Sequence, residues 1–245
     1  MRRIAAVTFD LWDTLIQEVP GGSDKVADLR IDRMWRYLTE KGMVHTKREV
    51  ADAYRKSGDF LEMTWSKHRD MPVRDQVLFI LTSVDSKLTG KLSREDLQKI
   101  EGFYADSIVD NPPLLFPEAK DALKAVKAKG YRLGLISNTG RTPGSVLRVL
   151  MERMGILTYF DTTTFSNEIL VRKPAPGAFT VTLDKLRVLP KAAVHVGDDA
   201  DSDMAGAKKV GMKTMHFVPD GATPSSSADL HTRSLEQVVR LIDDL

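Results

Sequence analysis

The feature that most constrains the fold is a short apolar run at residues 4–9, which ends abruptly in the segment Asp10-Leu11-Trp12-Asp13-Thr14. The run predicts a strand buried on both faces, as in a parallel sheet. Ligands of open α/β sheets bind at the carboxyl ends of the strands, where Asp10 stands. A carboxylate there can attack phosphorus or carbon and hold a covalent intermediate. The segment alone also fits an aspartate that only caps a turn, so its meaning depends on residues further along the chain.

Three later segments each contribute a different functional group. They are the hydroxyl of Ser137 after the apolar run 131–136, the ammonium of Lys173, and an acidic cluster at 197–203 after the run 192–196. Phosphoryl transfer needs a nucleophile, donors to the non-bridging oxygens, a cation for the developing charge and carboxylates for Mg²⁺. The ordered set therefore favours a catalytic carboxylate at Asp10 over a turn cap.

The pattern of elements divides the chain into a core and an insert. From about residue 114 onward apolar strands alternate with helices, as in βαβ units, whereas residues from about 18 to 113 are helical in pattern. We therefore predict an α/β fold with a doubly wound, mostly parallel Rossmann-like sheet and an inserted all-α domain. The predicted boundaries are 1–16 with 114–245 for the core and 17–113 for the insert.

Within these parts, capping and breaking signals set the expected elements. Thr46 and Glu49 form a capping box, Ser93 caps a later helix, and a second capping box spans Ser234 to Gln237. Further strands are expected at 162–165 and 213–218, and a loop at 221–227. The expected helices end at Gly42 or cover about 46–63, 74–88, 94–109, 117–129, 143–154, 177–186 and 204–210.

These motifs resemble those of the haloacid dehalogenase-like (HAD) hydrolase superfamily. The matching residues are Asp10 and Thr14 in FDLWDTL, Ser137 in LISNTG, Lys173 in VRKPAPGAF, and Asp198 with Asp203 in HVGDDADSDMAGA. The resemblance spans nearly the whole chain. It implies that the helical insert is a cap domain, which closes over the site, excludes water and carries substrate specificity.

The resemblance also implies a role for each matching residue. Asp10 would be the nucleophile of an aspartyl-phosphate intermediate, and Lys173 would neutralise charge between nucleophile and phosphate. Ser137, with backbone amides near Asn138, would donate to the phosphate, while Thr14 would position the loop or donate as well. Trp12 and Asp13 are expected to border the substrate.

A Mg²⁺ site follows from the same resemblance. Its ligands would be the Asp10 carboxylate, the backbone carbonyl of Trp12, and Asp198, with waters completing the octahedron. Asp203 is expected to orient the lysine or a water on the metal, and Asp199 is a secondary metal candidate.

Position 12 departs from the pattern of phosphatases in this superfamily, which usually carry a second Asp two residues after the nucleophile. Trp12 cannot do general acid–base work, a loss of about 10²–10⁴-fold in rate. Asp13 or a residue of the helical insert is the candidate replacement, and Asp13 would serve only if the backbone turned locally, because side chains alternate in an extended segment. A weak phosphatase that favours good leaving groups is another interpretation.

Two further alternatives stay open. The chain resembles the 2-haloacid dehalogenase branch in having no acid at position 12 and an Asn at 138, although the acidic cluster argues against that metal-free chemistry. A catalytically weak scaffold that binds phosphate is the non-enzymatic alternative.

Composition excludes several classes. The 36 Lys and Arg against 34 Asp and Glu leave a net charge of +2, so no strong field points to nucleic acid. The chain has no cysteine for a disulfide, thiolate zinc site or thiol nucleophile. No apolar stretch approaches a membrane span. Since the predicted catalytic strand follows directly on the basic segment Met1–Arg3, we expect no cleaved leader and a cytoplasmic monomer or homodimer acting on a small phosphorylated substrate.

Other candidates are less specific. Arg30, Arg33 and Arg36 recur every third residue, off the apolar face of their helix, and fit either a solvated face or a wall toward an anionic substrate. A second mixed cluster comprises Trp65, His68 and Arg69. His195 lies within a strand and is expected in the core.

Overall fold

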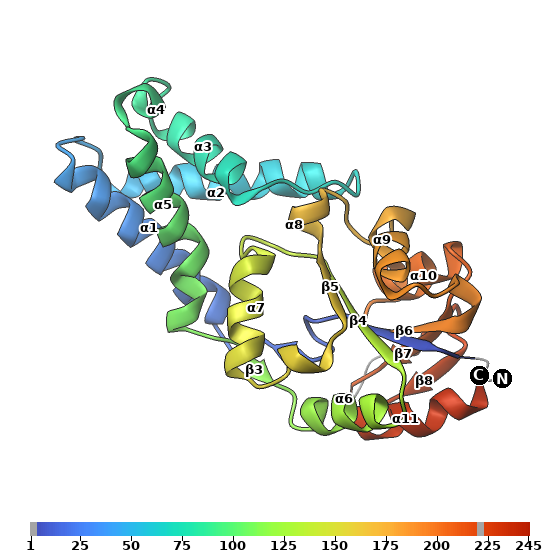
Figure 1. Ribbon diagram of the computed structural model, residues 1–245. Helices are drawn as coiled ribbons and strands as arrows, with labels where there is room; N and C mark the ends of the chain where they lie inside the picture. Colours follow the sequence, from blue (N-terminus) through green and yellow to red (C-terminus); the bar gives the residue numbers. More distant parts are fainter. Residues whose placement is uncertain (1–3, 220–222) are drawn as a thin grey trace.

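Six parallel strands form the central sheet of the computed structural model, which describes residues 4–219 and 223–245 (Figure 1). Their order is β5-β4-β1-β6-β7-β8, and each neighbouring pair runs parallel. The bounds are β1 Ala6–Phe9, β4 Arg132–Ser137, β5 Thr162–Phe165, β6 Ala193–Gly197, β7 Lys213–Phe217 and β8 Leu230–Thr232. The predicted parallel α/β sheet is confirmed, with β8 as an additional strand that the sequence did not indicate.

Helices cover both faces of the sheet, which confirms the doubly wound arrangement. One face packs on α6 (Ala119–Ala128), α7 (Gly144–Arg153) and α11 (Val238–Leu241), with Phe9 and Leu135 in the shared core. The other face packs on α9 (Pro176–Leu186) and α10 (Gly206–Lys209), where Ile136 meets Phe179. The strands are apolar on both sides because both sides are covered.

The helical insert lies to one side of the sheet (Figure 1). It consists of α1 (Gly22–Glu40), α2 (Lys47–Trp65), α3 (Val73–Val84), α4 (Leu88–Lys91) and α5 (Arg94–Asp106). These helices share their own hydrophobic cluster, in which Met34, Leu38, Ile80 and Tyr104 are fully buried. Where the chain leaves and re-enters the core, β2 (Ile16–Gln17) pairs antiparallel with β3 (Leu114–Leu115).

Several helix boundaries differ from those expected. The single helix expected at 74–88 is interrupted at Asp85, whose extended backbone ends α3 and whose side chain accepts a hydrogen bond from the Lys87 amide. The helix expected at 94–109 ends earlier as a 3₁₀ helix at Ser107–Asp110, and that expected at 204–210 begins earlier with a π-type turn at Ala200–Ala205. The Thr46–Glu49 capping box is confirmed.

The capping box expected at Ser234–Gln237 is wrong. Ser234 accepts from the Glu236 amide and precedes a 3₁₀ helix at Leu235–Gln237. Its hydroxyl donates instead to Glu118, 116 positions earlier in the chain, so the acidic partner comes from tertiary structure. A short helix, α8 (Ser166–Ile169), was also not expected.

The described residues do not test some of the predictions made from the sequence. Met1–Arg3 and residues 221–222 of the expected loop lie outside the described residues. Over the described ranges, no helix has the length and apolar character needed to span a bilayer. The cytoplasmic location and the monomeric or dimeric state stay predictions.

Candidate active site

The carboxyl ends of three neighbouring strands bring the candidate residues to one edge of the sheet. β1 lies between β4 and β6. Asp10 follows β1, Ser137 ends β4 and Asp198 follows β6, so side chains far apart in the sequence meet because the strands are parallel.

Lys173 connects two of the carboxylates. Its Nζ lies 2.5 Å from Oδ1 of Asp10 and 2.5 Å from Oδ1 of Asp203. Asn138 holds the backbone of the lysine, because its Oδ1 accepts from the Lys173 amide at 2.8 Å and its Nδ2 donates to the Lys173 carbonyl at 3.1 Å. The side chain of Asn138 is thus engaged in positioning Lys173.

Negative charge exceeds positive charge among these buried groups. Burial raises the pKa of Asp10 to about 8 against the attraction of Lys173, and burial with the neighbouring Asp203 raises the pKa of Asp198 to about 6. Burial opposes charge on Lys173, but its two carboxylates outweigh burial and raise its pKa. The charge of one ammonium does not balance the charges of three carboxylates, so a further cation would be stabilised at this site.

Asp203 is the best-compensated of the carboxylates. Burial alone would raise its pKa, but Lys173 and His195 keep the pKa below its ordinary value. His195 Nε2 lies 2.9 Å from Asp203 Oδ1, and the Asp199 amide donates to Oδ2 at 3.2 Å. A Cβ at Gly197 would lie only 2.4 Å from Asp203 Cγ, so the strand needs glycine there. His195 lies in the core as expected, and it also supports this carboxylate.

The acidic cluster contains a set of oxygen atoms suited to a hard divalent cation. One carboxylate oxygen from each of Asp10, Asp198 and Asp203 lies within 4.8 Å of the others. Thr14 donates to Asp198 Oδ1 at 3.0 Å and so orients that carboxylate. Asp199 is exposed, lies outside this set and caps the turn that follows, accepting from the amides of Asp201 and Ser202.

Ser137 has a hydroxyl that the protein leaves unsatisfied. Its side chain is 2% exposed, and Oγ is buried without a hydrogen-bond partner, alone in this respect among the described residues. A buried hydroxyl without a partner costs free energy unless a ligand or water supplies one. The atom at the end of β4 therefore fits a contact to bound substrate.

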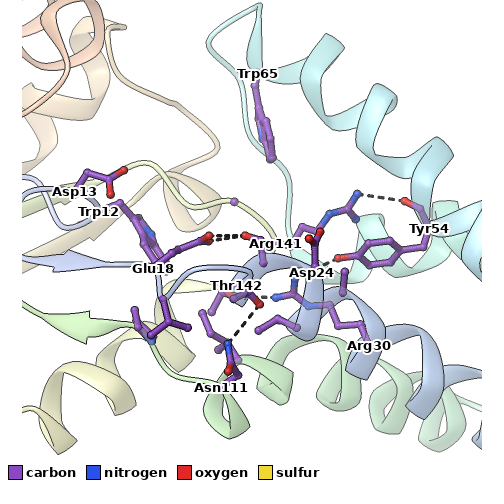
Figure 2. Close-up of a pocket in the computed structure, with 18 residues that line it drawn as sticks. Trp12, Asp13, Glu18, Asp24, Arg30, Tyr54, Trp65, Asn111, Arg141 and Thr142 are labelled. Atoms are coloured by element: carbon purple, nitrogen blue, oxygen red, sulfur yellow. Dashed lines mark hydrogen bonds between the residues drawn. The ribbon is translucent and has the colours of Figure 1, made fainter. Parts of the chain in front are cut away.

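The backbone turns at Asp13, contrary to the alternation expected for an extended segment. Its φ is 55°, in the left-handed region, which Asp tolerates better than most residues. Trp12 and Asp13 consequently both line the same pocket (Figure 2). Burial, with the neighbouring Glu18, raises the pKa of Asp13.

This pocket, of about 520 Å³, lies between the insert and the strand ends (Figure 2). Arg30 lines it and is only 5% exposed, so the expectation that it lies off the buried face is wrong. Arg33 and Arg36 instead pair with Asp110 and Asp32. The three arginines therefore do not form one wall. Trp65, from the second mixed cluster, also lines the pocket.

Asp70 is a junction residue that the sequence did not indicate. Its buried carboxylate accepts from Arg172 at 3.0 Å and from the hydroxyls of Ser166 and Thr139. The backbone of Arg69 forms an antiparallel bridge with Val171. The turn between α2 and α3 is thereby fixed to the segment that leads into Lys173. No local motif distinguishes this aspartate from an ordinary turn residue.

Comparison with known proteins gives the same family of hydrolases that the sequence motifs resemble. The family profile of haloacid dehalogenase-like hydrolases matches residues 4–211. The chain is 25% identical over 210 residues to the phosphoglycolate phosphatase of Escherichia coli O157:H7, covering 85% of this chain and 79% of the relative. It is 31% identical over 131 residues to the ribulose-1,5-bisphosphate 5-phosphatase of Halopiger xanaduensis, and there it spans only about half of either protein, 54% of each.

Solved structures share the fold. A 2-haloacid dehalogenase from Pseudomonas syringae pv. Tomato DC3000 aligns over 98% of this chain and 99% of its own, with a TM-score of 0.69 and 23% identity. A HAD phosphatase from Thermococcus onnurineus aligns over 98% of both chains, with a TM-score of 0.63 and 25% identity.

The parallel α/β sheet, the ordered strand-end residues and the profile match together define a hydrolase. More specifically, the chain belongs to the haloacid dehalogenase-like hydrolase family.

Proposed function

We propose that this hydrolase is a Mg²⁺-dependent phosphohydrolase that acts on a small phosphorylated metabolite through an aspartyl-phosphate on Asp10. The curated relatives named above are phosphatases of small phosphorylated compounds. The observation that carries the proposal is the buried, unsatisfied hydroxyl of Ser137 at the end of β4, the strand next to the one that leads into Asp10. A phosphoryl group supplies the acceptor that this hydroxyl lacks.

The carboxylates of Asp10 and Asp198 and the backbone carbonyl of Trp12 would hold Mg²⁺. The excess of buried carboxylate over ammonium supports a divalent cation at this place. When bound, Mg²⁺ would neutralise charge that develops on the phosphoryl oxygens. Asp203 would act by orienting Lys173, since its oxygens are already engaged.

In the first step, a carboxylate oxygen of Asp10 attacks phosphorus and the bond from phosphorus to the leaving oxygen breaks. Ser137 donates to a non-bridging oxygen, and Lys173 offsets the charge on it. In the second step, water attacks phosphorus, phosphate is released and the Asp10 carboxylate is restored. Trp12 cannot supply a proton to the leaving oxygen. Asp13 is the candidate acid, since it lines the pocket and has a raised pKa.

We further propose that residues 17–113 act as a cap domain and that 1–16 with 114–245 form the catalytic core. The separate hydrophobic cluster of the helices and the β2–β3 pair at the crossing points support these boundaries. The pocket between the two parts supports a role of the cap in enclosing substrate.

Hydrolysis of p-nitrophenyl phosphate and acetyl phosphate tests the proposal. We expect activity that requires Mg²⁺ and disappears in Asp10→Asn. Turnover that persists in that variant, or that ignores chelation of the metal, would refute it.

Dehalogenation is the second candidate, and the observation that favours it is Trp12, because halide leaves without an acid. Halide release from 2-chloropropionate without metal would replace the phosphatase proposal. If neither reaction occurs but phosphate binds, the chain is a phosphate-binding scaffold.

A further inference from the structure

Two arginines at the pocket between cap and core meet only neutral partners. Arg30 on α1 donates to the Tyr104 carbonyl at 2.8 Å, to the Tyr54 hydroxyl at 3.3 Å and to Thr142 Oγ1 at 2.9 Å. All three acceptors are uncharged, and the side chain is almost fully buried. Its positive charge is therefore hydrogen-bonded but not balanced.

Arg141 repeats this arrangement from the core side. It lies in the loop after β4 and donates to Ser57 Oγ at 2.8 Å and to the Tyr104 hydroxyl at 2.9 Å. Its guanidinium carbon lies 4.0 Å from the centre of the Tyr54 ring. Figure 2 shows Arg141 and Arg30 on the same side of the pocket, on either side of Tyr54.

No described carboxylate lies within 4.0 Å of either guanidinium, whereas Arg33, Arg148 and Arg172 each have such a partner. A cation withdrawn from water without a counter-charge costs free energy. Guanidinium groups bind carboxylate and phosphate oxygens in a fork geometry that few other side chains match. The pair thus lacks the anion that would balance it.

Carboxylates also line the pocket, but on its exposed parts. Asp13, which is partly buried, Glu18 and Asp24 all keep larger exposed fractions than either arginine, so water screens their charges more. Glu18 moreover accepts from the hydroxyl of Ser23. The buried Arg30 and the half-buried Arg141 are screened less, so their charges act more effectively on an anion in the pocket.

The pocket adjoins the segments that follow Asp10 and Ser137, although neither of these two residues lines it. Gly140 and Arg141 follow Ser137 in one loop, and Trp12 and Asp13 follow Asp10. We propose that Arg141, backed by Arg30, is a subsite for a second anionic group of the substrate. Resting on the proposed function, this inference assigns the substrate to phosphomonoesters that also carry a carboxylate or a second phosphate.

Phosphonates test the subsite without any turnover, because their carbon–phosphorus bond is not hydrolysed. Calorimetry with the full chain and Mg²⁺ would compare phosphonoacetate, 3-phosphonopropionate and 4-phosphonobutyrate with their carboxamides. We expect at least one acid to bind about 10- to 100-fold more tightly than its amide, the range of a charge-assisted hydrogen bond. The preference should vanish in Arg141→Gln, shrink in Arg30→Gln and return in part in Arg141→Lys.

Arg36→Gln is the matched control, since Arg36 lies on the same helix as Arg30, is exposed and has its own partner in Asp32. It should keep the preference. Equal binding of acids and amides by the wild-type protein at every length overturns the inference, and this result does not depend on any variant folding. A preference that survives in a folded Arg141→Gln protein also overturns it.

Different outcomes would reject the proposed function and the anion subsite. Hydrolysis of p-nitrophenyl phosphate without any preference for acids would reject only the anion subsite. A preference for acids without hydrolysis of any phosphomonoester would keep the subsite and reject the phosphohydrolase.

Discussion

Positive charge is balanced by carboxylates in one part of the site, its floor, and is left unbalanced in another part, its wall. On the floor, formed by the strand ends, the Lys173 ammonium contacts the carboxylates of both Asp10 and Asp203. On the wall, formed by Arg30 and Arg141, the guanidinium groups donate only to hydroxyls and carbonyls and lie against tyrosine rings. The floor holds its own counter-charges and an excess of carboxylate, whereas the wall has an excess of cation.

Under the proposed function, this difference separates chemistry from recognition. A nucleophile and its lysine have to be held in place before substrate arrives, so their charges are paired within the protein. A recognition group contributes most to the binding free energy when its charged partner is the ligand, so the protein itself does not balance its charge. Substitutions in each part therefore test whether the floor and the wall are as distinct as their contacts indicate.

The largest expected effect is on the floor. Replacing Asp10 by Asn removes the nucleophile but keeps the shape of the side chain, and should lower turnover of p-nitrophenyl phosphate on the order of 10⁴-fold or more. Asp201→Asn is the matched control, an exposed aspartate of the acidic segment outside the metal-suited set, and should retain activity. Equal activity of the two variants would mean that the floor is not the reacting centre.

Asp13 lies where floor and wall meet, and its effect should depend on the leaving group. Asp13→Asn should lower kcat for an alkyl phosphate about 10²-fold, because the alkoxide needs a proton. Acetyl phosphate, which releases a weakly basic carboxylate, should be hydrolysed at nearly the wild-type rate. Equal losses on both substrates would contradict a role for Asp13 as the acid.

The link between the helical insert and the core should be measurable as a change in the free energy of unfolding. Asp70→Asn breaks the buried pair with Arg172 and should lower the free energy of unfolding by about 3 kcal/mol in urea titrations. Glu95→Gln breaks an exposed pair with Lys99 in the same helical insert and should change it by about 0.5 kcal/mol or less. If both variants match the wild type, Asp70 does not hold the insert on the core.

The smallest expected effect is on the pH dependence of thermal stability in the absence of metal. Burial raises the pKa of Asp10 in the folded protein to about 8, above its ordinary value of 3.8, so the folded state binds more protons between these two pH values and stability falls as pH rises from one to the other. In a chelator, Asp10→Asn should therefore have a higher Tm relative to wild type at pH 8 than at pH 5. A Tm difference that is the same at both pH values would show that the floor carries no excess negative charge.

The sequence predicted the floor far better than the wall. Asp10, Ser137, Lys173 and Asp198 stand at the ends of apolar runs or at the start of a helix, and parallel strands bring such positions together. The burial of Arg30 depends on contacts with Tyr104 and Thr142, 74 and 112 positions away, which periodicity along α1 does not reveal. Asp70 likewise gains its role from residues about 70 to 100 positions later.

Local signals also failed where tertiary contacts replaced them. The Thr46–Glu49 capping box formed because both residues belong to one turn. Ser234 is predicted to pair in the same way, but its hydroxyl donates to the carboxylate of Glu118, which also accepts from the Leu235 amide. The turn at Asp13 was foreseen only as a condition for that residue to reach the site.

The most direct test of the central claim is the chemical identity of residue 10 during turnover. Quenching the reaction with borohydride in the presence of Mg²⁺ and acetyl phosphate reduces an aspartyl-phosphate to homoserine, which peptide mass spectrometry locates. We predict homoserine at position 10, and only with substrate present. Steady turnover with unmodified Asp10, or with homoserine at another aspartate, would contradict it.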